Sequence, residues 1–518
     1  MSAPERAGQS TPWPARYLGL DLGTSSLKAV ALDDVGQAVA SAPCLYPLAQ
    51  PHPGWAEQSP DDWWSALVVA VHDLAARGVR LDSLAAIGLT GQMHGLVLLD
   101  AHGDLIGPCQ TWADTRCVRE ARMVERRIGR ERLLSITGSR AYTSATAAKL
   151  LWVRRHEPAR WRAGRRVLLP KDFVRFRLTG ELATDVSDAS GTQLCAIATR
   201  DWSPYLLDAL DIPHTLPPPV MESTVIAGRV SAQAAHATGL PAGVPVVAGG
   251  GDAECAAVGL GLLGEPGDRG LALATLGTAG QFFAVAPGPE IDPTGRLQTL
   301  CHSVPGRWHV MHAILAGGSA LDWLAGILMP DTERSAAVAI LLDEATAIRP
   351  GAHGLIFMPH LAGTRTPEMN AFPCGAFVGL RPEHNRGCLM RAAVEGVALA
   401  LREGLDAAQS IGVPIERVRL AGGAYRHPLV ARVHADVFDL PVELGAPEDA
   451  SALGAALLAA AGITALPSLT AACRLISLPR MTLDPDPAAA ERYAELARIH
   501  RRLTPRLRST FAEVARAD

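Results

Sequence analysis

Short apolar runs separated by small polar turns open the chain. Residues 17–22 form one apolar run, the turn Gly23-Thr24-Ser25-Ser26 follows, and residues 27–32 form a second run. Because buried strands are short apolar segments bounded by turn residues, this pattern predicts a strand, a tight turn and a returning strand. A second turn at 33–36 leads to residues 37–42, so the opening is predicted to be a small antiparallel meander.

Helical patterns then alternate with strand patterns through the first half of the chain. Ser59 precedes Pro60 and two acidic residues, which is the usual order at the start of a helix. Residues 85–89 resemble a buried strand that ends in the polar turn 90–95, and turns at strand ends carry ligand contacts in α/β proteins. Further helices are predicted at 115–135, 145–156 and 169–178.

The second half repeats the opening arrangement. A predicted strand at 245–248 leads through three glycines to a predicted helix over 252–260, and a strand at 271–276 runs into the turn 277–280. This turn has the form of the turn at 23–26, and such a repeat implies two facing domains of related topology. The predicted division is a flexible arm at 1–15, an N-terminal domain at 16–243, a C-terminal domain at 244–480 and a helical tail at 481–518.

The last part of the chain adds a strand and two helices. A strand is predicted at 418–420, and a helix rich in small residues is predicted from Ala450. The apolar stretch 452–466 is shorter than the roughly 20 residues that a membrane span needs, so it predicts a closely packed buried helix and no membrane association. The tail from Pro487 is predicted to be helical and to break at Pro505.

Composition narrows the class of protein. The chain has 518 residues, of which 48% are hydrophobic and 19% charged, and its formal net charge is −4. This predicts two sizeable globular domains, and without a concentrated positive surface no nucleic-acid partner is expected. The N-terminal residues lack the apolar core of a secretory signal, and the nine cysteines form no CxxC pair. Reduced thiols, no zinc site and a cytoplasmic location are therefore expected.

Lysine is rare in this chain. Of the 48 basic residues only Lys28, Lys149 and Lys171 are lysines. One hypothesis is that they lie where a compact ammonium fits and a guanidinium does not, and the alternative is chance.

The two turns rich in Gly, Thr and Ser are candidate phosphate sites. Backbone N–H groups and hydroxyls in such a turn converge on one point and can hold phosphate oxygens. A plain hairpin turn would use the same residues, but the pair of turns, at 23–26 and 277–280, favours a nucleotide bound between facing domains. Beside the first turn, Asp21 could hold Mg²⁺ through water, and Lys28 would either add positive charge or fix the strand.

Phosphoryl transfer to an alcohol also needs a base for the hydroxyl proton. Asp252 opens a predicted helix, whose N-terminus favours negative charge, so it is a candidate base; its local sequence fits a simple N-cap equally well. His94 follows a strand end and is a candidate donor to a sugar hydroxyl, against the more common structural role of an isolated histidine. Asp114 and Arg116 are predicted to pair as a structural contact, with a role at the sugar site as the alternative.

Several segments together resemble the FGGY carbohydrate kinases in sequence, order and spacing, from Tyr17 to about Leu466. They are GLDLGTSSLKA at the start, PGWAEQSPDDWW at 53–64, IGLTGQMHG at 87–95, TWADTR at 111–116, KLLWVRRHEP at 149–158, LLPKDFVRFRLTGELATDVSDASGT at 168–192, VPVVAGGGD at 244–252, LGTAG at 276–280 and LAGGAYRHPL at 420–429.

The resemblance implies an α/β fold with two ribonuclease-H-like domains around a central cleft, as in the actin and hexokinase superfamily. It also implies ATP-dependent, Mg²⁺-assisted phosphorylation of a sugar, and D-xylulose is the first expectation for that sugar. Because similar kinases form homodimers, a homodimer is a further expectation. Asp252 matches the catalytic base, and Asp21 matches the acid that helps to organise the metal and the γ-phosphate. The remaining implied site residues are Gln92, Met93 (mainly through its backbone) and His94 for the sugar, Gly23, Thr24, Ser25, Ser26, Lys28, Gly277 and Thr278 for the phosphates, and Gly422, Gly423 and Ala424 for the nucleotide.

The chain departs from the family pattern at three places. Ala253 and Glu254 follow the acid where relatives often carry Asn, Ala279 stands where serine is usual, and the segment 317–323 is unexpectedly rich in glycine. One sugar contact is therefore lost or supplied by another group. Alternatives are a kinase for another ketopentose or a pentitol, such as ribulose or arabinitol, and a non-catalytic actin-like nucleotide-binding protein. The acid at 252 and the sugar loop at 92–95 argue against this last class.

Overall fold

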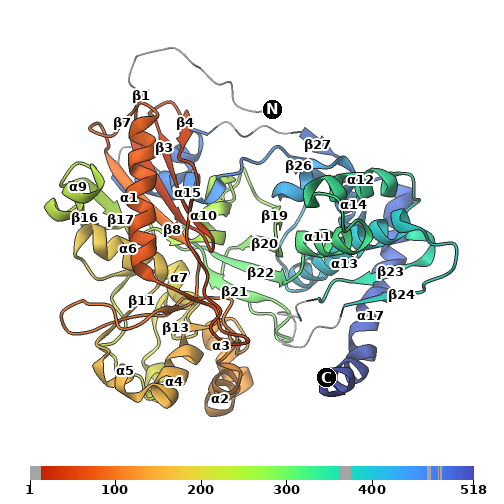
Figure 1. Cartoon of the computed structure of the whole chain (residues 1–518), viewed down its shortest axis with the longest axis horizontal. Helices are drawn as coiled ribbons and strands as arrows, with labels where there is room; N and C mark the ends of the chain where they lie inside the picture. Colours follow the sequence, from red (N-terminus) through yellow and green to blue (C-terminus); the bar gives the residue numbers. More distant parts are fainter. Residues whose placement is uncertain are drawn as a thin grey trace.

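The computed structural model describes residues 13–361, 363, 375–463, 468–476, 478 and 481–517. Two large sheets, one of eight strands and one of seven, form its two halves (Figure 1). The N-terminal half lies on the left of this view and the C-terminal half on the right. The predicted two-domain α/β architecture is thus confirmed.

The first sheet contains the predicted meander and adds parallel strands to it. Its strands are β2 (Tyr17–Leu22), β3 (Ser26–Leu32), β4 (Ala38–Ala40), β5 (Cys44–Leu45), β8 (Ala86–Gly91), β16 (Ile226–Arg229), β17 (Pro245–Val247) and β18 (Gly250–Gly251). The order is β16-β17-β8-β2-β3-β4, with β5 on β3 and β18 on β8. The register of β2 with its two neighbours sets Asp21 opposite Lys28 on β3 and opposite Thr90 on β8.

Helices cover the two faces of the first sheet in different ways. On one face lie α1 (Pro60–Ala76), α6 (Pro170–Thr179) and α9 (Ala232–Thr238), which bury large side chains such as Trp63 and Phe173. On the other face lies α15 (Ala450–Gly462). A Cβ atom at Gly19 or Gly88 would lie 1.9 Å from a backbone carbonyl oxygen of α15. The predicted small-residue buried helix is therefore confirmed, and its backbone packs directly against the strands.

The second sheet has the order β21-β22-β20-β19-β25-β26-β27. These strands are β19 (Leu271–Leu276), β20 (Gly280–Ala286), β21 (Gln298–Cys301), β22 (Trp308–Ile314), β25 (Arg417–Ala421), β26 (Val442–Leu444) and β27 (Met481–Leu483). Helices α11 (Gly318–Leu328), α12 (Arg334–Thr346), α13 (Arg386–Ser410), α14 (Pro428–Phe438) and α17 (Pro487–Ala517) build the core on one face. Helix α10 (Asp252–Gly259) packs on the other face and also contacts α15, so it lies between the two sheets.

The internal repeat is present in the strand pairing. In the first sheet the antiparallel hairpin β2–β3 continues to the parallel strands β8 and β17. In the second sheet the hairpin β19–β20 continues in the same way to β25 and β26. The turns at 23–26 and 277–280 therefore occupy equivalent positions in two related sheets.

The chain changes from the first sheet to the second between Gly251 and Leu271, because β17 and β18 both pair with β8. The boundary predicted at 243 precedes these two strands. Helix α15 returns to the first sheet near the end of the chain.

A helical lobe follows β8 and lies at the lower left of Figure 1. Its helices are α2 (Val118–Ile128), α3 (Arg130–Thr137), α4 (Thr146–His156), α5 (Pro158–Ala163), α7 (Val186–Ser190) and α8 (Pro204–Ala209). The single helix predicted over 115–135 is two helices, because Gly129 between them has a φ of 88°. Short two- and three-residue strands, among them β9 (Val97–Leu99) and β11 (Arg166–Leu168), complete this region.

The tail forms one helix, α17, which continues through Pro505; the predicted break at this residue is wrong. Proline removes one backbone hydrogen bond, here the one to the carbonyl of Arg501, which is an exposed residue near the end of the chain. Within the described ranges, none of the helices combines the length and the apolar character needed to cross a membrane.

Candidate active site

The first turn is closed by its own backbone and held by side chains from distant segments. The Gly23 N–H donates to the Ser26 carbonyl over 3.0 Å. The hydroxyl of Tyr46 donates to the Gly23 carbonyl (2.5 Å), and the indole N–H of Trp112 donates to the Thr24 hydroxyl (2.8 Å). The turn therefore depends on contacts from outside its own hairpin.

Gln92 links the predicted sugar loop to this turn. Its amide donates to the Gly23 carbonyl (3.3 Å) and to Oε1 of Gln58 (2.7 Å), and Gln58 donates to the Thr24 carbonyl (2.6 Å). The side chain of Gln92 is buried. These contacts give Gln92 a role in holding the turn, while its sugar contact stays a prediction.

Charged residues from three elements gather beside the first turn. Lys28 on β3 bonds to Asp449 at the start of α15, with 2.7 Å between Nζ and Oδ1. Oδ1 of Asp21 is buried and has no hydrogen-bond partner among the described residues. Burial raises the pKa of the Asp21 carboxyl to about 7; the negative charges of Asp252 and Asp449 add to the rise, and Lys28 opposes it. A carboxyl in this state would gain from a nearby cation.

Asp252 is the first residue of α10, and Gly251 occupies the N-cap position. The interpretation of Asp252 as a simple N-cap is therefore wrong. Its Oδ1 accepts the N–H of Ala253 over 2.9 Å, and its backbone carbonyl accepts the hydroxyl of Ser451 over 3.2 Å. The residue is partly exposed. Its carboxylate thus lies at a helix N-terminus within reach of solvent, and its backbone is bonded to α15.

The second turn is held mainly by backbone groups. The N–H groups of Gly317 and Gly318 donate to the carbonyls of Thr278 (2.9 Å) and Gly277 (2.7 Å), and the hydroxyl of Ser319 donates to the Thr278 carbonyl (2.8 Å). The glycine-rich segment noted in the sequence therefore supports this turn from the start of α11.

The second turn opens onto a cavity of about 490 Å³, a volume typical of small-molecule sites. Gly277, Thr278, Gly422 and Gly423 all line it, as predicted for a nucleotide site. Ala424 lies instead against the hydrophobic core of the second sheet.

The same cavity reaches the carboxylates through the start of α15. Glu448, Ala450 and Ser451 line the cavity, while Asp449 between them pairs with Lys28. The ion pair therefore connects the strand after the first turn to the wall of the cavity.

His94 has a φ of 68°, which is unusual for a residue other than glycine. Its Nδ1 lies 3.0 Å from the carbonyl oxygen of Gly191, and its ring makes an edge contact with Tyr142. Because a carbonyl only accepts, Nδ1 carries the proton in this contact. The role of His94 as a donor to a sugar hydroxyl stays a prediction. The neighbouring Met93 is buried against the second sheet.

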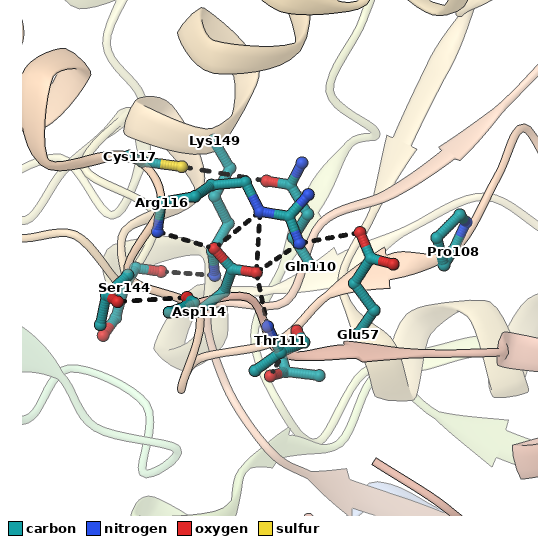
Figure 2. A network of polar contacts seen from close by, with 12 residues as sticks. Glu57, Pro108, Gln110, Thr111, Asp114, Arg116, Cys117, Ser144 and Lys149 are labelled. Carbon is teal, nitrogen blue, oxygen red and sulfur yellow. Dashed lines mark hydrogen bonds and ion pairs between the residues drawn. The ribbon is translucent and has the colours of Figure 1, made fainter. Parts of the chain in front are cut away.

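Figure 2 shows the contact predicted between Asp114 and Arg116, which is confirmed. The guanidinium of Arg116 also bonds to Glu57 (2.7 Å) and lies 3.4 Å from the ring centre of Trp55. The Arg116 side chain is 2% exposed, so it is enclosed by the lobe rather than presented to a ligand. The pairing itself is thus confirmed, and the alternative role at the sugar site is not tested by these contacts.

The site fits Mg²⁺ in the way that kinases bind it. This ion takes one or two carboxylates and keeps several waters and substrate phosphates as its other ligands. Asp21, with its unpaired Oδ1, and the nearby Asp252 are suitable carboxylates. Closed sites of three or more His, Cys, Asp or Glu do not occur within the part of the chain that the structure describes.

Sequence reasoning missed Asp449, Gln58, Trp112 and Tyr46. Asp449 immediately precedes the helix predicted from Ala450, so its position at a helix start could be predicted from the sequence. Its pairing with Lys28 could not. Gln58 and Trp112 lie inside segments that carry the family resemblance, which was the available signal.

Comparisons with known proteins agree with this geometry. Models of the N-terminal and C-terminal domains of the FGGY family of carbohydrate kinases match residues 16–259 and 272–463. The xylulose kinase of Escherichia coli K12 is 39% identical over 86% of this chain and 89% of its own length, and that of Bacillus subtilis 168 is 34% identical over 86% and 88%. The crystal structure of the xylulose kinase from Rhodospirillum rubrum superposes with a TM-score of 0.85 at 32% identity, covering 96% of this chain and 99% of the other.

Proposed function

Because the chain belongs to the FGGY family of carbohydrate kinases, we propose that it transfers the γ-phosphate of ATP to D-xylulose, giving D-xylulose 5-phosphate and ADP. One observation carries the proposal. Asp252 is the first residue of α10, whose Ala256 borders a cavity of about 490 Å³, and the predicted residues Gly277, Thr278, Gly422 and Gly423 line that cavity. Similarity to several xylulose kinases supports the choice of sugar.

In this mechanism Asp252 is the general base. Its carboxylate takes the proton of the terminal hydroxyl of the sugar as that oxygen attacks the γ-phosphorus. The position at the N-terminus of α10 favours the ionised form that a base requires.

The remaining residues bind and orient the two substrates. Backbone N–H groups of the turn at 277–280 hold phosphate oxygens, and Lys28 adds positive charge near the first turn. The ring of His94, which Gly191 holds through Nδ1, forms a hydrogen bond with a sugar hydroxyl. Asp21 and Asp252 would hold Mg²⁺, which would supply positive charge to screen the phosphates.

A coupled ADP-release assay tests the proposal. The purified protein is supplied with ATP, Mg²⁺ and D-xylulose, and parallel reactions contain ribulose, the pentitols and glycerol. We expect the highest kcat/KM with D-xylulose. ATP binding without sugar-stimulated ADP release would instead support a non-catalytic nucleotide-binding protein.

The variant Asp252→Ala tests the base. It should lower kcat by roughly 10³-fold or more, because a positioned base contributes about 10²–10⁴-fold, and should leave ATP affinity nearly unchanged. Appreciable sugar-dependent turnover by this variant would reject the role of Asp252.

The sugar panel is needed because of the departure at residues 253–254. Glu254 is fully buried, with Oε1 3.3 Å from Nε2 of His309, so it does not take over the sugar contact that relatives make with Asn. A faster reaction with ribulose or arabinitol would assign the alternative substrate.

Compartment and assembly complete the proposal. The eight cysteines within the described residues are free thiols, which supports a reducing compartment such as the cytoplasm. A homodimer is proposed from the behaviour of similar kinases, and light scattering at assay concentrations tests it.

A further inference from the structure

Lys149 is a fully buried cation that bonds to the sugar loop. It lies on α4, and it has no exposed surface. Nζ donates to the backbone carbonyl of His94 and to that of Ser144, each over 2.7 Å. Figure 2 shows the second of these contacts beside the Asp114–Arg116 pair. Among the described residues, no carboxylate forms an ion pair with this ammonium.

Such a position is energetically unfavourable for a charge. Taking an ammonium out of water costs several kcal/mol unless a partner compensates for the loss. Burial lowers the pKa of Lys149 to about 8; Cys109, Cys117 and the carboxylate of Asp114 oppose this shift through longer-range electrostatic interactions. The hydrogen bonds to the two carbonyls are therefore its main compensation.

The carbonyl that Lys149 holds belongs to a strained residue. His94 adopts a left-handed φ of 68°, and a residue other than glycine keeps this conformation only when its surroundings fix it. The hydroxyl of Thr146, also on α4, donates to the same carbonyl over 3.2 Å, and Gly191 holds the ring through Nδ1. Backbone and ring of His94 are thus fixed from opposite sides.

We propose that Lys149 is a positioning residue for sugar binding: its ammonium fixes the His94 carbonyl, and through it the direction in which the His94 ring meets the substrate. This inference rests on the proposed function. It also explains why lysine is retained here in a chain that otherwise uses arginine, since two carbonyls 2.7 Å from one nitrogen match a compact ammonium.

The test is the kinetics of Lys149→Met, which keeps the apolar stem and removes the ammonium. KM for D-xylulose should rise by about 10–100-fold, because small misplacements of binding groups have effects of this size, while KM for ATP should change by less than about twofold. Lys149→Arg should fail to restore sugar binding, since the larger planar group cannot occupy the same point.

Arg154→Met is the matched control. Arg154 is a cation on the same helix and also donates to two backbone carbonyls, those of Leu210 and Asp211, away from the sugar loop. Its loss should leave both KM values within about twofold of the wild type if the effect of Lys149 is specific to His94. Equal effects of the two variants would make Lys149 a general structural residue and overturn the inference.

If thermal melts show that Lys149→Met is not folded, the variant Thr146→Val tests the same inference. It removes the weaker bond to the same carbonyl and should raise KM for the sugar by about threefold, with KM for ATP unchanged. If the folded variants have an unchanged KM for the sugar, the role of Lys149 is wrong but the proposed function still stands. Absence of D-xylulose turnover by the wild-type enzyme would overturn the proposed function, and this inference with it.

Discussion

The two phosphate turns occupy equivalent positions in two related sheets, yet different groups hold them. The turn at 23–26 is fixed by side chains of Tyr46, Gln58 and Trp112, which come from segments outside its hairpin. The turn at 277–280 is fixed chiefly by backbone N–H groups of residues 317–318 and opens onto the large cavity.

This difference indicates a division of roles. Side chains from several segments fix the first turn beside Asp21 and Lys28, where a small displacement would change the alignment of the reacting groups. Backbone contacts leave the surface of the second turn free for a ligand, which suits phosphate binding by N–H groups. We therefore propose that the first of these two similar turns aligns the reacting groups and that the second binds phosphate.

The largest effect is expected at the first turn, from Asp21→Asn. Turnover should fall by about 10³-fold, because the variant removes a preorganised charge from the reaction site. The folded state of the variant, in contrast, should be more stable than that of the wild type. The raised pKa of Asp21 means that the folded state disfavours its charged form, so ionisation lowers stability increasingly as pH rises from about 4 to about 7.

Thermal melts between pH 5 and pH 8 measure this effect. The variant should gain stability over the wild type as pH rises, reaching roughly 2 kcal/mol at pH 8 for this partly buried group. The exposed Asp82→Asn serves as the control. A stability difference that stays constant with pH would contradict the assignment.

Gly422→Ala should produce the next largest effect, on the second turn. Gly422 has a φ of 113°, and a Cβ atom there would lie 2.5 Å from the carbonyl oxygen of Leu276, which directly precedes the turn. We expect a loss of roughly 1–3 kcal/mol in stability and at least a tenfold rise in KM for ATP, with KM for the sugar less affected.

Gly423→Ala is the matched control, because a Cβ atom at that position meets nothing within 4 Å. It should retain wild-type stability. Similar destabilisation in both variants would show that strain at Gly422 is not the cause.

Gln58→Leu tests the side chains that hold the first turn. Gln58 bonds to the Thr24 carbonyl, to Gln92 and to the indole of Trp63, so its loss should loosen the turn. We expect kcat to fall by about tenfold with little change in KM for ATP. Steady-state kinetics measure this effect, with the exposed Gln409→Leu as the control. A rise in KM for ATP without loss of kcat would reverse the proposed division of roles.

Ser319→Ala should have the smallest effect. It removes a single side-chain bond to the Thr278 carbonyl, while the backbone bonds from Gly317 and Gly318 remain. KM for ATP should rise by less than about threefold. A much larger rise in the same ATP titration would mean that the second turn also depends on side chains.

The sequence predicted those features that depend on neighbouring residues. Short apolar runs and turn residues identified the hairpin at 17–32, the repeated turn at 277–280 and the small-residue helix from Ala450. The family resemblance added the residues that line the cavity. These features are local, so their pattern is visible in one segment at a time.

Other features depend on contacts between distant segments. The partner of Lys28 is Asp449, 421 residues later, and no local pattern could select it among the carboxylates. Gly129 divides a predicted helix because its φ is positive, whereas Pro505 does not divide α17. Both outcomes depend on packing and solvent access, and the propensities of single residues do not predict these.

The burial of two lysines has a practical consequence. Lys149 and Lys171 are enclosed, while the side chain of Lys28 is 31% exposed beside the carboxylates. Apart from the α-amino group, a reagent that acylates amines therefore meets a single target in the folded protein, and that target is in the catalytic centre. If Lys28 serves the reaction as proposed, dyes and resins that attach through amines are poorly suited to this enzyme, and its exposed carboxylates are the better points of attachment.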